Sequence, residues 1–262
     1  MQSPSQKSHA RVKAVIAILL TFTAGIVDIV GYMTVYHLFV AHMTGATVHL
    51  GNKFEIGAWP DVARAFVIIA SFVAGSVAGR AVIEAGARGR NRTVASMTMA
   101  AEALLVLAFV RIGAAVLKQS TPETIPVGIS CLLLGLLAAA MGLQTATLTR
   151  IGPLTIHTTF VTGMLNKLAQ EGARWLFWIH DSWRENGNII GFIGNSRKQT
   201  SFRNAAFMGT IWFSYAVGSI AGTWMDSRWK IAALYLPVCI LLASIVVDQL
   251  QPLSLEEEKD QI

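Results

Sequence analysis

The chain has 262 residues, of which 53% are hydrophobic and only 14% are charged. Soluble domains carry about 25% charged residues, so this composition excludes an ordinary soluble domain and indicates a membrane protein. The formal net charge of +6 comes from cations grouped between apolar stretches, which reflects membrane topology and argues against a nucleic-acid partner.

Six stretches are long and apolar enough to cross a bilayer, whose ~30 Å core needs about 20 apolar residues. The first exceeds the ~7–15 apolar residues of a signal-peptide core, so we interpret it as a retained span. The sequence thus predicts an all-α integral membrane protein with six transmembrane helices. They are expected over Ala14–Tyr36, Ala65–Ala85, Val94–Val116, Val127–Leu148, Ala205–Met225 and Ile231–Val247.

Lysine and arginine residues gather before the first span, between the second and third, and between the fourth and fifth. The first two groups are Lys7, Arg11 and Lys13, and then Arg88, Arg90 and Arg92. Because cationic loops stay in the cytoplasm, both termini are expected there. The predicted location is the inner membrane, crossed several times, with the lipid bilayer as an obligatory partner.

A nine-residue segment occurs twice, as Ser71-Phe-Val-Ala-Gly-Ser-Val-Ala-Gly79 and Ser214-Tyr-Ala-Val-Gly-Ser-Ile-Ala-Gly222. If each copy carries three spans, the second copy inserts upside down, because an odd number of crossings inverts it. Inverted repeats are typical of secondary transporters, which bind substrate where the repeats meet. We therefore predict two inverted three-helix repeats, over residues 14–123 and 124–250.

The remaining segments are shorter. Residues 1–13 are predicted to be a disordered cytoplasmic tail, and residues 251–262 an acidic one. A Trp- and Arg-rich insertion at residues 173–204 lengthens the second repeat. Trp and Arg together favour the level of the lipid headgroups, so this insertion is expected to anchor at the cytoplasmic face.

The connector after the first span of each repeat is too apolar to be an ordinary loop and too short to cross the membrane. Each connector contains a Thr-Gly pair, Thr44-Gly45 in the first and Thr162-Gly163 in the second. Two interpretations stay open: an amphipathic helix on the bilayer surface, or a re-entrant segment broken at the glycine. A broken segment would expose backbone groups to a substrate.

Several motifs in this order resemble the YoaK-like family of six-span bacterial inner-membrane proteins, which is grouped as a domain of unknown function. They are Ala24-Gly-Ile-Val-Asp28, Phe39-Val-Ala-His-Met-Thr-Gly45, Met141-Gly-Leu-Gln-Thr-Ala146 and Thr158-Thr-Phe-Val-Thr-Gly163. The resemblance covers nearly the whole chain and implies six spans without naming a substrate. The chain departs from the family pattern at Ala46 and Thr145, where the family usually has Asn.

Asp28 and Gln144 are the polar residues expected to line a substrate or ion pathway, together with His42 and the two Thr-Gly pairs. Ionisable groups inside spans are costly and usually face a cavity or a partner. Asp28 and Gln144 lie at nearly matching positions of the two repeats, so we expect them to meet near the midplane. The structural alternatives are that Asp28 caps a broken helix or hydrogen-bonds a neighbouring span, and that Gln144 makes an interhelical hydrogen bond. His42 is a candidate proton-sensitive gate.

Other polar and small residues have structural interpretations. Glu102 is expected to pair with Arg80 across the short turn between the second and third spans. The histidines lack the spacing of a helical metal site, so no metal is expected. Four glycines form small-residue stripes that predict close helix packing, between the two halves or between two chains of a homodimer; they are Gly75, Gly79, Gly218 and Gly222.

The sequence favours a small-molecule permease or exporter, with proton coupling through Asp28, over a non-transporting membrane sensor or assembly protein. It contains no G-x-S-x-G, no H-E-x-x-H and no paired acidic motif with metal spacing. We therefore expect no enzyme activity, no catalytic residue and no cofactor. The substrate, the coupling ion, the direction of movement and the oligomeric state do not follow from the sequence.

Overall fold

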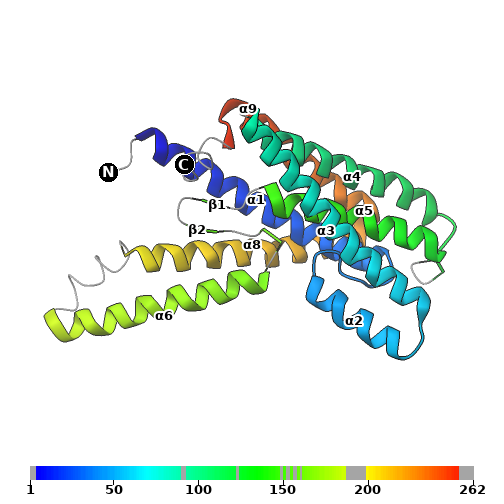
Figure 1. The fold of residues 1–262 in the computed structure, drawn as a ribbon, viewed down its shortest axis with the longest axis horizontal. Coiled ribbons are helices and arrows are strands. Elements are labelled where there is room, and N and C mark those ends of the chain that lie inside the picture. The colour runs from blue at the N-terminus through cyan, green and yellow to red at the C-terminus, as the bar shows by residue number, and fades with distance from the viewer. Residues whose placement is uncertain are drawn as a thin grey trace.

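The computed structural model describes residues 4–89, 93–121, 124–147, 150–151, 154–155, 158–159, 161–186 and 199–253. This part of the chain is almost entirely helical (Figure 1). The helices are α1 (Pro4–Thr34), α2 (Met43–Glu55), α3 (Trp59–Arg88), α4 (Val94–Val116), α5 (Val127–Thr147), α6 (Val161–Asn186), α8 (Thr200–Trp229), the 3-10 helix η1 (Lys230–Leu234) and α9 (Tyr235–Leu250). Two short strands, β1 (Arg150–Ile151) and β2 (Leu154–Thr155), pair antiparallel ahead of α6.

Within the described residues, five helical stretches are long and apolar enough to cross a membrane, which agrees with the predicted membrane class. They are His9–Thr34 within α1, then α3, α4 and α5, and finally Thr200–Leu250, which contains α8, η1 and α9. The last has 51 residues, more than twice the ~20 that one crossing needs. Its path changes at Lys230, whose φ of 50° lies in the left-handed region that non-glycine residues rarely adopt.

The bundle is organised around two helix pairs, α1 with α8 and α3 with α5, which make the most extensive contacts in the molecule. Helix α4 packs against α5 and α9, and α9 also contacts α1. The core between these helices is apolar and includes the fully buried Leu20, Leu137, Met141 and Phe109. In Figure 1, α1 begins and α9 ends at the same end of the bundle.

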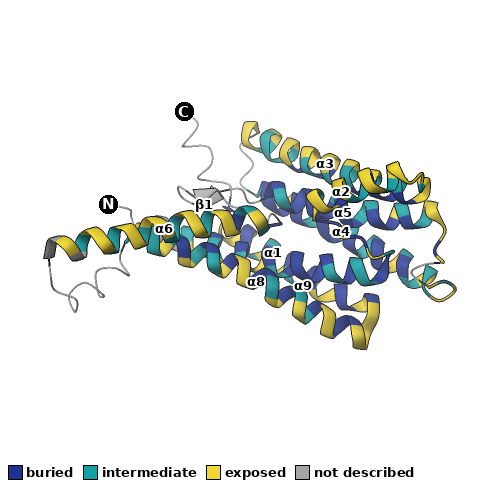
Figure 2. Cartoon of the chain, turned by 90° about the horizontal axis from the view of Figure 1, so that it is seen from below, coloured by how far each residue is buried: buried dark blue, intermediate teal, exposed yellow. Residues whose placement is uncertain are grey.

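The outer faces of the long helices are also apolar. Figure 2 shows exposed residues along the outside of α3 and α8, and buried residues where helices meet. Phe66 is 61% exposed, Leu104 is 67% and Ile220 is 71%. Large apolar side chains that stay exposed on a bundle with a packed core indicate a surface that faces lipid.

The four glycines predicted to pack do lie at helix crossings, and the crossings join the two halves. A methyl group on Gly75 would overlap the carbonyl oxygen of Ala139 in α5, and one on Gly218 would overlap that of Phe22 in α1. The other two, Gly79 and Gly222, face Ala146 and Ile29 at the same two crossings. Because these positions have no side chain, the backbones can approach closely.

The connectors form two helices outside the bundle, α2 against α3 and α6 against α8 (Figure 1). Thr44-Gly45 and Thr162-Gly163 lie in the first turns of α2 and α6, where each helix begins. The interpretation that the glycine breaks a helix is therefore wrong. Gly45 would accept a methyl group, whose nearest neighbour would be the Cβ of His42 at 3.9 Å, so tight packing does not require this glycine.

Candidate functional site

Asp28 lies in α1 and is 1% exposed, yet both of its carboxylate oxygens are satisfied. Oδ1 accepts hydrogen bonds from the backbone N–H groups of Val40 at 2.9 Å and Ala41 at 3.0 Å. These amides precede α2 and have no helical partner of their own. The carboxylate thus fixes the segment that leads from α1 into α2, because a buried carboxylate and buried amides both need partners.

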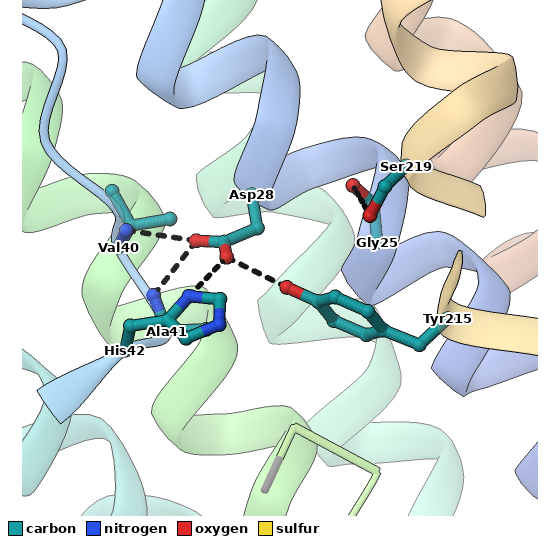
Figure 3. A network of polar contacts seen from close by, with 7 residues as sticks. All are labelled: Gly25, Asp28, Val40, Ala41, His42, Tyr215 and Ser219. Atoms are coloured by element: carbon teal, nitrogen blue, oxygen red, sulfur yellow. Dashed lines mark hydrogen bonds and ion pairs between the residues drawn. The ribbon is translucent and has the colours of Figure 1, made fainter. Parts of the chain in front are cut away.

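The second oxygen of Asp28 contacts two side chains, one in α8 and one just before α2 (Figure 3). Oδ2 accepts a hydrogen bond from the hydroxyl of Tyr215 in α8 at 2.7 Å and lies 2.6 Å from Nδ1 of His42. Asp28 therefore makes four polar contacts, about as many as an ionised carboxylate can accept. The arrangement places an imidazole, a phenol and two amides around one buried charge.

The backbone reaches this position through an unusual turn. Tyr36 and His37 have φ values of 54° and 51°, so two consecutive non-glycine residues adopt the left-handed conformation at the end of α1. The turn folds the following segment back along α1, where the rings of Phe39 and Tyr32 stack with centroids 4.4 Å apart. Phe39 also contacts the ring of His42, at 4.9 Å between centroids.

His42 connects the buried carboxylate to the surface. Its side chain is 43% exposed, whereas that of Asp28 is 1% exposed. The hydrogen bond to Asp28 raises the pKa of His42 above its ordinary value; partial burial opposes the rise and the negative charge of Asp28 adds to it. A titratable imidazole therefore contacts both the exterior and a charge inside the bundle.

Gln144 is fully buried in α5, but it does not meet Asp28 as expected. Its Nε2 donates to the carbonyl oxygen of Leu20 at 2.7 Å and to the hydroxyl of Thr158 at 3.2 Å. Leu20 lies eight residues before Asp28, which is ~12 Å along a helix. Gln144 thus contacts α1 from inside the bundle, at a different level from Asp28.

The Thr-Gly pairs supply none of the four polar contacts of Asp28. Thr44, Gly45 and Thr162 are exposed, and Gly163 is partly buried. The hydroxyl of Thr145, in the span of Gln144, instead contacts that of Thr159, just ahead of α6. The polar contacts that precede α6 thus involve the hydroxyls of Thr158 and Thr159, whereas those that precede α2 involve the carboxylate of Asp28.

The ion pair expected between Arg80 and Glu102 is wrong. Arg80 lies on an exposed face of α3 and pairs with Glu84 one turn farther along the same helix. Glu102 faces the interior of the bundle, is 1% exposed and has no hydrogen-bond partner among the described residues. The two helices are neighbours, but these two side chains lie on faces that do not meet.

A second buried ionic cluster was missed by the sequence reasoning. Nη1 of Arg64 donates to Asp61 at 2.7 Å, and Nε donates to the hydroxyl of Ser130 at 2.8 Å. Nζ of Lys53 lies 3.3 Å from Asp61, and the guanidinium of Arg64 lies 3.7 Å above the ring of Tyr36. The i, i+3 spacing of Asp61 and Arg64 at the start of an apolar stretch was the available signal.

Another buried carboxylate, Asp248 at the end of α9, was also not anticipated. It accepts hydrogen bonds from the backbone N–H of Ser96 at 2.9 Å and from that of Leu253 at 2.8 Å. Ser96 lies in the first turn of α4, where a negative charge compensates the unpaired amides and the helix dipole. Asp248 resembles Asp28 in its burial and its backbone contacts, but no described histidine pairs with it.

Comparisons with known proteins cover nearly all of these helices. The family model of DUF1275, described as a protein of unknown function, matches residues 16–247. The chain is 23% identical over 233 residues to the UPF0700 transmembrane protein YoaK of Bacillus subtilis (strain 168), which covers 89% of this chain and 92% of that protein. No solved structure matches. The family resemblance inferred from the motifs is confirmed.

Proposed function

This chain belongs to the DUF1275 family of proteins of unknown function, and we propose that it is a proton-coupled permease or exporter of small molecules in the inner membrane. The observation that carries the proposal is the 2.6 Å contact between the buried carboxylate of Asp28 and the half-exposed imidazole of His42. Ionisable groups are kept inside membrane helices mainly where they bind or relay charge.

The contacts provide a route for one proton. Nδ1 of His42 faces Oδ2 of Asp28, and the ring is partly exposed. A proton taken up at Nε2 from water makes an imidazolium, which can pass its Nδ1 proton to the carboxylate. The imidazole is then neutral again, and Asp28 is a neutral acid that accepts hydrogen bonds less strongly.

Protonation of Asp28 would loosen two connections at once. One is to the amides of Val40 and Ala41, which hold the segment before α2, and the other is to Tyr215 of α8. Because α1 and α8 belong to opposite halves of the sequence, a proton at Asp28 would change how strongly the halves adhere. Coupling of this kind is what alternating access requires.

We also propose that the halves are inverted three-span repeats. Gly25 in α1 lies against Tyr215 and Ser219 of α8, and a methyl group added to it would lie 2.9 Å from the nitrogen of Ser219. Gly142 in α5 lies against Phe72 and Ser76 of α3, where the same addition would lie 2.8 Å from the nitrogen of Ser76. In the duplicated segment, Tyr215 corresponds to Phe72 and Ser219 to Ser76, so the same crossing occurs twice.

The six-span form of this proposal counts α8 and α9 as separate crossings. Their combined length and the break at Lys230 support that count. The cationic segments then lie on the cytoplasmic side together with both termini.

The test is proton flux in proteoliposomes loaded with a pH-sensitive dye and challenged with a panel of metabolites. Wild-type protein should couple at least one metabolite gradient to proton movement, and Asp28→Asn and His42→Gln should abolish the coupling. Asp248→Asn is the matched control, because it neutralises a buried carboxylate that also accepts backbone hydrogen bonds.

The outcomes separate transport from folding. His42→Gln changes a partly exposed side chain, so it should fold even if Asp28→Asn does not. Retained coupling in a folded His42→Gln protein would refute proton coupling through this pair. A wild-type protein that moves no metabolite and no protons would refute the permease.

A specific feature favours the alternative of a sensor or assembly protein. Helix α6 projects from the bundle in Figure 1, and its Leu176 and Phe177 are 59% and 71% exposed. An exposed apolar face beside cationic residues suits a lipid surface or a protein partner. Absent flux, together with copurifying partners that are lost on Phe177→Asp, would favour that function.

A further inference from the structure

Glu102 is a buried carboxyl group inside α4 with no partner in the part of the chain that the structure describes. The residue is 1% exposed, and neither carboxyl oxygen takes part in a hydrogen bond. The ion pairs found among described residues all involve other carboxylates. A bare carboxylate in an apolar bundle is costly, so a proton or a cation must neutralise it.

Gln144 in α5 presents a second unsatisfied oxygen. Its Nε2 donates a hydrogen bond to the carbonyl oxygen of Leu20. The amide oxygen could not make this contact, because both oxygens are acceptors, so the orientation of the amide is fixed. Oε1 is consequently the end turned away from Leu20, and it is buried without a partner among the described residues. The residue itself is 0% exposed.

The register of α4 and α5 brings these two residues to the same level. The hydroxyl of Thr147 donates to that of Thr98 at 2.9 Å, and a methyl group on Gly113 would lie 3.9 Å from Cδ2 of Leu133. The helices are therefore antiparallel. Glu102 lies one turn beyond Thr98, and Gln144 lies one turn before Thr147, each on the same face as its neighbour.

We propose that Glu102 and Gln144 form a binding site for a small monovalent cation, buried between α4 and α5. Two carboxylate oxygens and one amide oxygen are hard ligands of the kind that such cations prefer. Their total charge of −1 matches a monovalent ion, whereas a divalent ion would leave a positive charge uncompensated in the bundle. The hydroxyls of Thr98 and Thr147 lie one turn away.

A cation explains the three free oxygens better than a proton does. A proton on Glu102 would make one hydroxyl donor and would satisfy one acceptor at most. An ion placed between the helices contacts all three oxygens together. The site is distinct from the Asp28 network and does not require that the protein transports anything.

The experiment measures sodium binding to the purified full chain in nanodiscs. Thermal unfolding is followed in NaCl and in N-methyl-D-glucamine chloride at equal ionic strength. Sodium should raise the Tm along a saturating curve, as expected for a ligand bound only by the folded state. Binding of ²²Na⁺ to wild-type protein should saturate at one ion per chain.

Three variants locate the site. Glu102→Gln keeps the shape and removes the charge, so it should lose both the Tm shift and the bound ²²Na⁺. Gln144→Ala should weaken the apparent sodium affinity by about ten- to hundredfold. Glu84→Gln, which changes a partly exposed glutamate in the neighbouring α3, should behave as wild type.

Two results would overturn the site. One is a wild-type Tm that responds to pH and not to sodium or potassium, since Glu102 would then carry a proton. The other is a Glu102→Gln protein that binds ²²Na⁺ as wild type does. Neither readout involves transport. A protein that binds sodium and carries no substrate would therefore refute the permease proposal and leave the sodium site standing.

Discussion

The hydroxyl of Tyr215 donates a hydrogen bond to Oδ2 of Asp28 at 2.7 Å and so joins α8 to α1 inside the bundle. The two residues come from opposite halves of the sequence and are both buried. The same crossing holds the close contact between Gly25 and the backbone of α8. The crossing of α1 and α8 thus combines a close approach of the two backbones with the buried charge of Asp28.

Tyr215→Phe should destabilise the protein by about 1.5–3 kcal/mol, since hydrogen bonds to charged groups contribute that much. The variant leaves Asp28 with three polar contacts and a buried lone pair. SDS titration of the protein in mixed micelles would measure the change in unfolding free energy. Tyr235→Phe, which removes a hydroxyl from a tyrosine that is 42% exposed, should change it by less than about 0.5 kcal/mol. Equal effects of the two variants would contradict the role given to Tyr215.

His42 gives the protein a predictable dependence of stability on pH. Its pKa is raised in the folded state, so the folded protein binds the proton more tightly than the unfolded chain. The stabilisation is complete below the unfolded pKa of about 6.5 and is lost as the pH rises through the raised pKa. Unfolding free energies measured between pH 5 and 9, about the range in which His titrates, would show this loss in the wild-type protein. The loss should be absent from His42→Gln.

His49 in α2 provides a control, because its pKa is shifted in the opposite direction to that of His42. Desolvation, followed by the charge of Lys53, lowers the pKa of His49 against a smaller opposing effect of Asp61. The folded protein therefore resists protonation there, and stability falls as the pH drops below about 6.5. His49→Gln should reduce the loss at acid pH and leave the neutral range unchanged. The same pH slope in both variants would show that neither histidine causes it.

The sequence predicted the features that depend on local pattern. Apolar length located the long helices, and the spacing of Gly75 and Gly79 indicated a close crossing because small residues four apart lie on one helix face. Asp28 stands out in the sequence because a charge inside an apolar span is costly. Its partners were not predictable, since they depend on the turn at Tyr36 and His37, which no glycine or proline marks.

The two wrongly predicted side-chain pairings depend on how the helices pack against one another. Arg80 and Glu102 are close along the hairpin, but only Glu102 faces the interior. Gln144 and Asp28 match in the repeat, yet Gln144 contacts α1 at Leu20, eight residues before Asp28. Asp61 lies where an apolar stretch begins, so the sequence pattern assigns it to a connector. Packing decides such contacts, and hydropathy does not encode it.

Gly218→Ala should destabilise the protein by about 1–3 kcal/mol, the usual cost of overpacking. The new methyl group would overlap the backbone carbonyl of Phe22, which no side-chain rotation relieves. Gly172→Ala in α6 is the matched control, because nothing lies within 4 Å of the position that its new methyl group would take. That variant should stabilise the helix by up to about 1 kcal/mol. A neutral Gly218→Ala would mean that α1 and α8 do not cross as closely as described.

Arg64→Ala should lower the free energy of unfolding by about 3–5 kcal/mol, because it removes the guanidinium partner of the buried Asp61. The Arg64 side chain is 5% exposed and binds Asp61, Ser130 and the face of Tyr36. Arg80→Ala removes a similar intrahelical pair whose side chains are 45% and 40% exposed, and it should cost less than about 1 kcal/mol. Unfolding free energies measured in the same micelles compare the two. A small effect of Arg64→Ala would show that the cluster is not needed for stability.

Reporter fusions test the orientation and the number of crossings together. If cationic segments stay inside, a fusion after Arg90 should report the cytoplasm and one after Lys118 the periplasm. If α8 and α9 cross separately, fusions after Lys230 and at the C-terminus should report opposite sides, periplasm and cytoplasm respectively. The same signal at both positions would mean that the 51-residue run Thr200–Leu250 does not contain two spans. Each half would then not have three crossings, and the halves could not be inverted copies.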